Sequence, residues 1–196
     1  IKLYVSENVE NGYGWQSVGS YGNEAYLAAK NNDKDTVAKI KKAILKEADG
    51  IVKTSKADPY GTGDYYYWGG NMGILHDASL LSEANKISPN EDYVNFAKEH
   101  INYCFGKNAN AKSFLTGYGT DAAANPHHRP STVKKEAIPG MLVGGVNKKL
   151  EDDYAKVYLK GKAPAKCYLD NAESYSINEV DIYWNASLVG ALARLN

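Results

Sequence analysis

The sequence has little that would direct the chain to a membrane or to nucleic acid. None of its apolar runs approaches the roughly 20 residues that a helix needs to cross a bilayer. Lysine and arginine together number 23, as do aspartate and glutamate, so no net positive charge attracts a polyanion. Residues 1–4 have neither the charged nor the apolar region of a signal peptide, so we expect any such signal to have been removed upstream. The composition favours a neutral partner, with no nucleic acid and no membrane.

Cysteine is scarce, and so are signs of internal division. Cys104 and Cys167 lie in apolar contexts, where they either pair or stay as buried thiols, the commoner case, and this leaves the redox compartment open. We find no sequence repeat of fixed period and no linker. With 43% hydrophobic residues, residues 1–196 can form one core, and we expect a single domain.

Tyrosine, in contrast, is abundant, with 16 residues against three phenylalanines and three tryptophans. A tyrosine presents an apolar ring face and a hydroxyl group, which suits the mixed surface of a sugar ring. Any single tyrosine is more often a half-buried packing residue. The excess of tyrosine therefore favours a saccharide ligand, but it does not identify which tyrosines would bind it.

Apolar spacing predicts helices separated by loops. Val37, Ile40, Ile44 and Ala48 recur at intervals of three and four, which predicts an amphipathic helix over residues 34–49 that ends at Gly50. Other helices are expected over residues 23–31, 74–81, 92–104, 150–159 and 178–195. No period-two pattern indicates a strand, so the predicted class is all-α with long functional loops at one end.

Two dense clusters occupy the last part of the sequence. The first runs from Ser-Phe-Leu-Thr-Gly-Tyr-Gly at 113–119 to Asn-Pro-His-His-Arg at 125–129. The second runs from Tyr-Leu-Asp at 168–170 through Tyr-Ser-Ile-Asn-Glu-Val at 175–180 to Trp-Asn at 184–185. Together they resemble the two active-site signatures of glycoside hydrolase family 9, the inverting cellulases and endoglucanases. Segments that look like family segments in family order also occur at 14–19, 66–71, 104–108 and 139–145.

The resemblance implies part of an (α/α)6 barrel, a six-hairpin toroid with a cleft across one end. The chain resembles a little less than the second half, the C-terminal portion of the catalytic domain. The family's paired aspartates lie in an Asp-Ala-Gly-Asp stretch near the start of that domain, and these 196 residues contain no such stretch. Because one of that pair activates water, we expect the isolated chain to be inactive or nearly so.

By position in the second signature, Glu179 matches the family's general acid. Inverting hydrolysis needs this acid on one face of the sugar and a carboxylate base on the other, roughly 6.5–9.5 Å away. A glutamate near a helix start is ordinarily stabilised as the anion or acts as a cap, so the site must offset this by burial or by a like charge. Asp170, the other signature carboxylate, is a candidate for supplying that charge or for orienting its neighbours.

The first signature supplies nitrogen donors. His127 matches the active-site histidine and completes the predicted catalytic set, and Arg129 matches the signature arginine. Such donors can bind hydroxyl groups next to the scissile bond. His128 is expected to support the loop, because adjacent histidines seldom converge on one metal ion. No cofactor is predicted; some relatives bind structural calcium, but the loop 58–64 is only a weak candidate and no metal is assigned.

Aromatic side chains near the glycine-rich loops are candidate stacking platforms for glucosyl rings, with core packing as the alternative for each. Trp184 is favoured most, because the family carries an aromatic residue beside the acid. Asn71 and Asn178 either contact hydroxyl groups or cap helices. The full set of candidate platforms is Trp68, Tyr67, Tyr118, Tyr175 and Trp184.

Two positions depart from the family pattern, Asp121 in the first signature and Asp181 in the second. We expect Asp181 to lie on a helix and to point away from Glu179, since residues two apart do not share a helix face.

The predicted function is endoglucanase-type hydrolysis of β-1,4-glucosidic bonds in cellulose or a related glucan, which implies a secreted protein. The alternative is a saccharide-binding module that has kept the cleft and lost catalysis. Half a barrel also exposes apolar flanks, so we expect self-association or a missing N-terminal segment that completes it.

Overall fold

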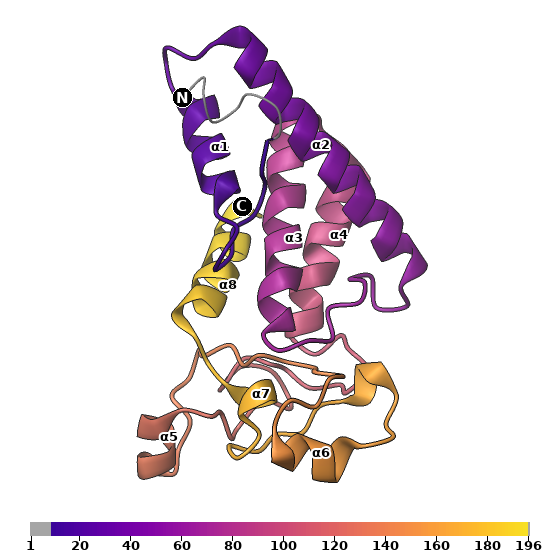
Figure 1. Cartoon of the computed structure of the whole chain (residues 1–196), viewed down its shortest axis with the longest axis vertical. Coiled ribbons are helices and arrows are strands. Elements are labelled where there is room, and N and C mark those ends of the chain that lie inside the picture. Colours follow the sequence, from indigo (N-terminus) through magenta and orange to yellow (C-terminus); the bar gives the residue numbers. More distant parts are fainter. Residues whose placement is uncertain (1–8, 196) are drawn as a thin grey trace.

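The computed structural model describes residues 9–195, so residues 1–4 lie outside the described part. Over the described range the chain forms helices and loops, with isolated β-bridges and no strand. None of the helices described is long and apolar enough to span a membrane. The long helices are α1 (Gly19–Ala28), α2 (Lys34–Ala57), α3 (Gly70–Ile87), α4 (Glu91–Cys104) and α8 (Ile182–Arg194) (Figure 1).

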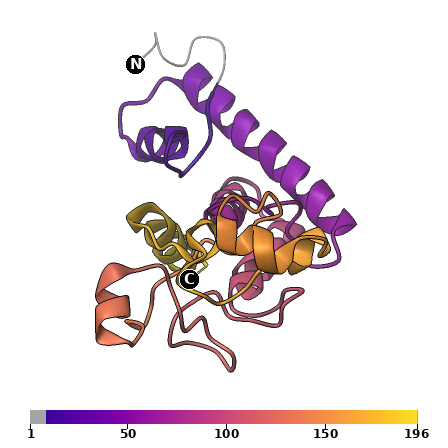
Figure 2. The same ribbon diagram turned by 60° about the horizontal axis from the view of Figure 1, so that its bottom comes forward.

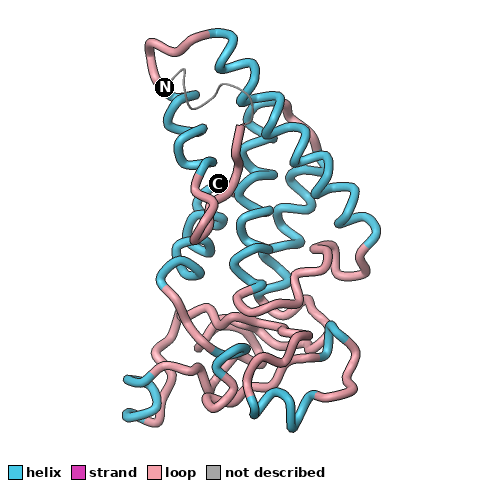
Figure 3. The backbone as a smooth tube through the Cα atoms, in the orientation of Figure 1, coloured by secondary structure: helices cyan, strands magenta, loops and turns pink. Residues whose placement is uncertain are grey.

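Loops and short helices gather at one end of these long helices, as predicted (Figure 3). Figure 2 brings this end forward. The short elements are α5 (Arg129–Lys134), α6 (Asp153–Leu159), α7 (Tyr175–Asn178) and the 3-10 turn η1 (Pro164–Lys166).

Helix α3 is the centre of the core, because it packs against α2, α4 and α8. Its Leu75 and Leu81 are fully buried. Both cysteines are buried free thiols, which settles between the two alternatives left by the sequence. The outer face of α8 is different, since Ile182, Val189 and Leu192 remain exposed.

Helix α2 is longer than predicted. It continues to Ala57, because Ile51 and Ser55 extend the buried stripe by further steps of three and four, while Gly50 faces open space. The prediction that Gly50 ends the helix is wrong: a solvent-facing glycine costs only about 1 kcal/mol of helix propensity, which the buried stripe offsets. Helix α1 begins four residues before the predicted start, with the Ser20 amide bonded to the Gly12 carbonyl.

The predicted C-terminal helix over 178–195 is two helices. Helix α7 ends at Asn178, and α8 begins at Ile182 with Asp181 as its N-cap, accepting from the Tyr183 amide at 2.7 Å. Between them Val180 pairs with Val143 in an antiparallel bridge, which keeps the backbone extended. The expectation that Asp181 lies within a helix is therefore wrong, and Glu179 stands in the extended link.

Candidate active site

Four of the predicted site residues meet at the loop end of the fold. The Trp68 indole Nε1 donates to Glu179 Oε2 at 2.9 Å. The Tyr175 ring lies 5.4 Å from the Trp68 ring and 5.9 Å from the His127 ring, measured between centroids. We call Trp68, His127, Tyr175 and Glu179 the loop-end cluster. It joins a carboxyl group, an imidazole and two partly exposed aromatic rings from three separate segments of the chain.

The backbone on both sides of Glu179 is fixed. Its amide donates to the Tyr175 carbonyl at 3.0 Å, and its carbonyl accepts from the Gly144 amide at 3.0 Å. The His127 amide donates to the Asn178 carbonyl at 2.7 Å, forming a parallel bridge that joins the two signatures. Glu179 is thus the C-cap of a four-residue helix and not its start. The expectation that a helix N-terminus stabilises the Glu179 anion is therefore wrong.

Asn178 and Asn71 support this backbone from beneath, and both are almost fully buried. The Asn178 side chain accepts from the Tyr168 hydroxyl at 3.0 Å and donates to the Leu169 carbonyl at 2.7 Å. The Asn71 side chain donates to the Val143 carbonyl at 2.8 Å. Neither side chain caps its helix, and neither is free to bind a sugar hydroxyl. Both expectations are therefore wrong, and the two side chains instead hold the backbone in place.

His127 is exposed, and its orientation follows from one contact. Its Nδ1 lies 2.6 Å from the Ala172 carbonyl, which can only accept, so Nδ1 donates this bond and Nε2 is left for another partner. His128 instead bonds the buried Ser131 hydroxyl at 2.9 Å. The two histidines therefore have separate partners, and His128 supports the start of α5. Arg129 is the exposed first residue of α5, and its side chain makes no hydrogen bond with the described residues.

Asp170 is not part of the loop-end cluster. Its two carboxylate oxygens accept from the Ala124 and Asn125 amides at 2.8 Å each, and Lys112 lies 3.2 Å away. These contacts fit the orienting role, because they fix the loop that leads to His127. Lys112 also pairs with Asp121 at 2.7 Å, which gives the departure at Asp121 a structural partner. Burial alone would lower the pKa of Lys112, but its bonds to both carboxylates outweigh this and raise it.

Lys112 and Asp152 are the supporting residues that sequence reasoning missed. Asp152 is fully buried and links α6 to α7 through Ser174 and Ser176. A lysine next to the first signature and an aspartate before a helix are too common in sequences to single out. The sequence does show two serines two residues apart, Ser174 and Ser176, but this spacing does not indicate that Asp152 is their partner.

The remaining candidate platforms lie elsewhere. Tyr67 is half-buried and packs against Tyr65 and α3, where burial and then Asp77 raise its pKa. Tyr118 is exposed on another loop near Gly140, and among the described residues its side chain makes no hydrogen bond or ring contact with the loop-end cluster. Trp184 is 9% exposed, so its ring has no free face for a sugar. It fills the space beneath Gly69 and Gly144, whose added Cβ atoms would lie 2.8 and 3.2 Å from it.

The described residues include no group of three or more metal-ligating side chains. In the loop 58–64, Asp58 accepts from the Tyr60 and Thr62 amides, and Asp64 is paired with Lys148. These carboxylates are engaged by protein donors, and we assign no calcium.

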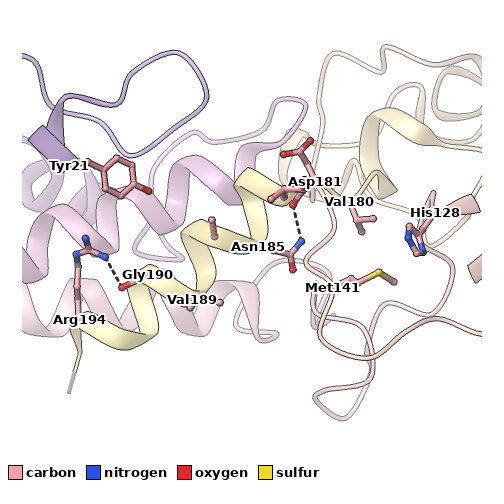
Figure 4. Close-up of a pocket in the computed structure, with 11 residues that line it drawn as sticks. Tyr21, His128, Met141, Val180, Asp181, Asn185, Val189, Gly190 and Arg194 are labelled. Carbon is pink, nitrogen blue, oxygen red and sulfur yellow. Dashed lines mark hydrogen bonds between the residues drawn. The ribbon is translucent and has the colours of Figure 1, made fainter. Parts of the chain in front are cut away.

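An apolar groove of about 920 Å³ runs along the outer face of α8 (Figure 4). Tyr21 and Arg194 lie toward one end of it, and His128 and Met141 toward the other. Val180 and Asp181 bring it next to the link that carries Glu179, but neither Glu179 nor His127 lines it. The groove and the loop-end cluster are therefore neighbouring but separate surfaces.

The loop end of this all-α fold brings together a carboxyl group, an imidazole and partly exposed aromatic rings, which are groups of the kind that line saccharide sites. Residues 3–192 match the sequence model of Glycosyl hydrolase family 9, and the chain belongs to that family. It is 38% identical over 194 residues to Endoglucanase D of Acetivibrio thermocellus, covering 96% of this chain and 29% of that protein. A cellodextrinase of Butyrivibrio fibrisolvens is 35% identical over 194 residues, with 96% and 35% covered.

Solved structures confirm the fold. A thermostable endoglucanase variant of Alicyclobacillus acidocaldarius superposes with a TM-score of 0.87 and 31% identity, covering 100% of this chain and 39% of that one. AaCel9A, in complex with cellobiose-like isofagomine, has a TM-score of 0.87 and 30% identity, covering 98% of this chain and 38% of that one. The chain thus matches part of a family 9 (α/α)6 barrel and spans about a third of the length of its relatives.

Proposed function

We propose that this chain is the C-terminal portion of a family 9 catalytic domain that hydrolyses β-1,4-glucosidic bonds with inversion, in the manner of an endoglucanase, and that Glu179 is its general acid. The observation that carries the proposal is the loop-end cluster, in which the Glu179 carboxyl accepts from Trp68 while the Trp68 and His127 rings both lie near the ring of Tyr175. A related protein and a similar solved structure, both named as endoglucanases, support a β-glucan as the substrate.

The contacts suggest a role for each group. Glu179 gives a proton to the leaving oxygen, while Trp68 and Tyr175, each 39% exposed, offer ring faces to glucosyl units. The Nε2 of His127 forms a hydrogen bond with a sugar hydroxyl, and Arg129 donates to one. Asp170 acts through the loop that it fixes and is a positioning residue. The β-glucan is polymeric and cannot enter a cell, so we propose that the protein acts extracellularly.

No Asp-Ala-Gly-Asp stretch is present in these residues, so nothing here activates water on the face opposite Glu179. The isolated chain should therefore bind glucans and not cleave them. The same observation favours a second candidate, a non-catalytic saccharide-binding module. In that case, supplying the missing segment restores no turnover.

The groove along α8 is the proposed contact for that segment. Its exposed Ile182 and Val189 form an apolar face of the kind that packs against further helices. Without a partner segment, we expect two copies to cover these faces by self-association.

Reducing-sugar release from carboxymethyl cellulose separates the candidates. The chain is assayed alone and with the N-terminal part of a family 9 endoglucanase that contains the aspartate pair, with Glu179→Gln as the inactive control. Turnover only after complementation, and only with Glu179 intact, supports the hydrolase. Binding of cello-oligosaccharides without turnover in either mixture supports the binding module. Turnover by the chain alone contradicts the proposal that the base is missing.

A further inference from the structure

Trp68 touches the Glu179 segment at two points. Its indole N–H donates to Glu179 Oε2 at 2.9 Å, and its ring lies 5.4 Å from the ring of Tyr175. Tyr175 begins α7 and Glu179 follows its end, so the two contacts span one helical turn. The indole N–H is therefore engaged by the carboxyl group, while the residue as a whole is 39% exposed.

The next residue in the chain, Gly69, sets the position of the indole. Gly69 has a φ of 75°, a left-handed conformation that strongly favours glycine. An added Cβ there would lie 2.8 Å from the Trp184 ring, so the turn sits directly on that buried side chain. Since the Glu179 backbone is also held, by the Gly144 amide and the Tyr175 carbonyl, both partners of the Trp68–Glu179 bond are anchored.

We propose that Trp68 is a positioning residue for Glu179 that determines which carboxyl oxygen carries the acidic proton, an inference that rests on the proposed function. An indole N–H can only donate, and a protonated carboxyl group has one hydroxyl and one carbonyl oxygen. Because the carbonyl oxygen of a carboxyl group is the better acceptor, the bond from Trp68 to Oε2 favours the form in which Oε2 is the carbonyl oxygen and Oε1 carries the proton. Oε1 is then the atom that faces the glycosidic oxygen.

The same bond strengthens during the reaction. As the sugar–oxygen bond breaks, its electron pair stays on the leaving oxygen, which takes the proton from Oε1, and Glu179 becomes an anion. A hydrogen bond to a carboxylate is about twice as strong as one to a neutral carbonyl. Trp68 therefore stabilises the transition state more than the ground state, which is the condition for raising turnover.

The bond itself can be tested on the 196-residue chain without any activity. The sequence has three tryptophans, so the indole N–H resonances can be assigned with single phenylalanine variants. The Trp68 resonance should shift as Glu179 titrates and exchange slowly, while Trp15, 66% exposed, gives the fast-exchanging internal reference. Glu179→Gln should abolish the pH response but keep slow exchange, and Glu179→Ala should abolish both. A Trp68 indole that exchanges as fast as Trp15 and ignores pH would overturn the proposal.

The catalytic consequence is tested on the complemented domain with Trp68→Phe, which keeps a ring against Tyr175 and lacks the N–H. Unactivated cello-oligosaccharides need a protonated leaving group, whereas 2,4-dinitrophenyl cellobioside does not. We expect kcat to fall about ten- to a hundredfold on the former and to change little on the latter. Trp15→Phe is the matched control and should change neither.

The outcomes separate this inference from the proposed function. Equal losses on both substrates would mean that Trp68 only stacks on sugar and would overturn the positioning role. If Glu179→Gln abolishes hydrolysis while Trp68→Phe is harmless, the inference fails and the proposed function stands. If Glu179→Gln has no effect, the proposed function fails, and this inference fails with it.

Discussion

Replacing Asp152 with alanine should loosen the segment that carries Glu179. Asp152 is 1% exposed, and one carboxylate oxygen caps α6 by accepting from the Ala155 amide at 2.7 Å. The other accepts from the Ser174 hydroxyl at 2.8 Å and the Ser176 amide at 3.1 Å. Ser174 directly precedes α7, so this one side chain joins α6 to the turn that ends at Glu179.

The expected loss follows from these contacts. Removing an N-cap costs about 1 kcal/mol, and leaving buried serine donors unpaired costs a further ~1–3 kcal/mol. The total, about 3 kcal/mol, is a large part of the ~5–15 kcal/mol by which a domain is usually stable. Burial alone would raise the pKa of Asp152, but bonds from Ser176, Ala155 and Ser174 outweigh it and lower the pKa. Its stabilisation is therefore complete above the unfolded-state pKa and disappears as pH falls through the folded-state value.

Urea denaturation followed by circular dichroism measures this loss at neutral pH and again in acid. Asp153→Ala is the matched control, because Asp153 is adjacent, exposed and paired with the exposed Lys156. Asp152→Ala should be about 3 kcal/mol less stable than the wild type at neutral pH, and the difference should shrink in acid. Stability within about 0.5 kcal/mol of the Asp153→Ala variant, the range of ordinary surface substitutions, would refute the reasoning.

Three further predictions concern other parts of the fold. Burial lowers the pKa of His76 to about 4, so between pH 6.5 and 4 the unfolded chain binds a proton that the folded chain does not, and the free energy of unfolding should fall by about 3 kcal/mol. His76→Gln should flatten that part of a profile of melting temperature against pH. Gly69→Ala puts a Cβ against Trp184 in a left-handed turn and should cost ~1–3 kcal/mol in urea denaturation, unlike Gly22→Ala, where nothing lies within 4 Å. Val189→Asp in the α8 groove should shift the chain from self-associated species to monomers in sedimentation velocity, and an unchanged distribution would exclude this face as the contact.

The long helices were predictable because their apolar stripes are local patterns. The stripe through Ile40 and Ile44 located α2, although its true end at Ala57 required knowing that Gly50 faces solvent. The C-terminal region was harder. Its apolar spacing continues through Glu179, but the bridge between Val180 and Val143 and the cap at Asp181 interrupt the helix. Pairing with a distant segment cannot be inferred from helical periodicity.

The site divides in the same way. The resemblance to the two signatures made Glu179 and His127 candidates, and the fold brings them onto adjacent backbones. Spacing could not show that Trp68 directs its N–H to Glu179, or that Trp184 lies buried below Gly69, because both depend on side-chain direction. The role of Lys112 could not be predicted for a related reason, because it depends on the ion pairs that Lys112 forms with Asp121 and Asp170 in the folded chain.

The anomeric form of the first product tests the central claim most directly. Cellopentaose is digested by the chain together with a family 9 N-terminal segment, and the new reducing ends are followed by proton NMR before they mutarotate. We predict the α-anomer first, as inversion at a β-linkage requires, with no product from Glu179→Gln. Early formation of the β-anomer, or turnover that survives Glu179→Gln, would contradict the assignment of Glu179 as the acid of an inverting site.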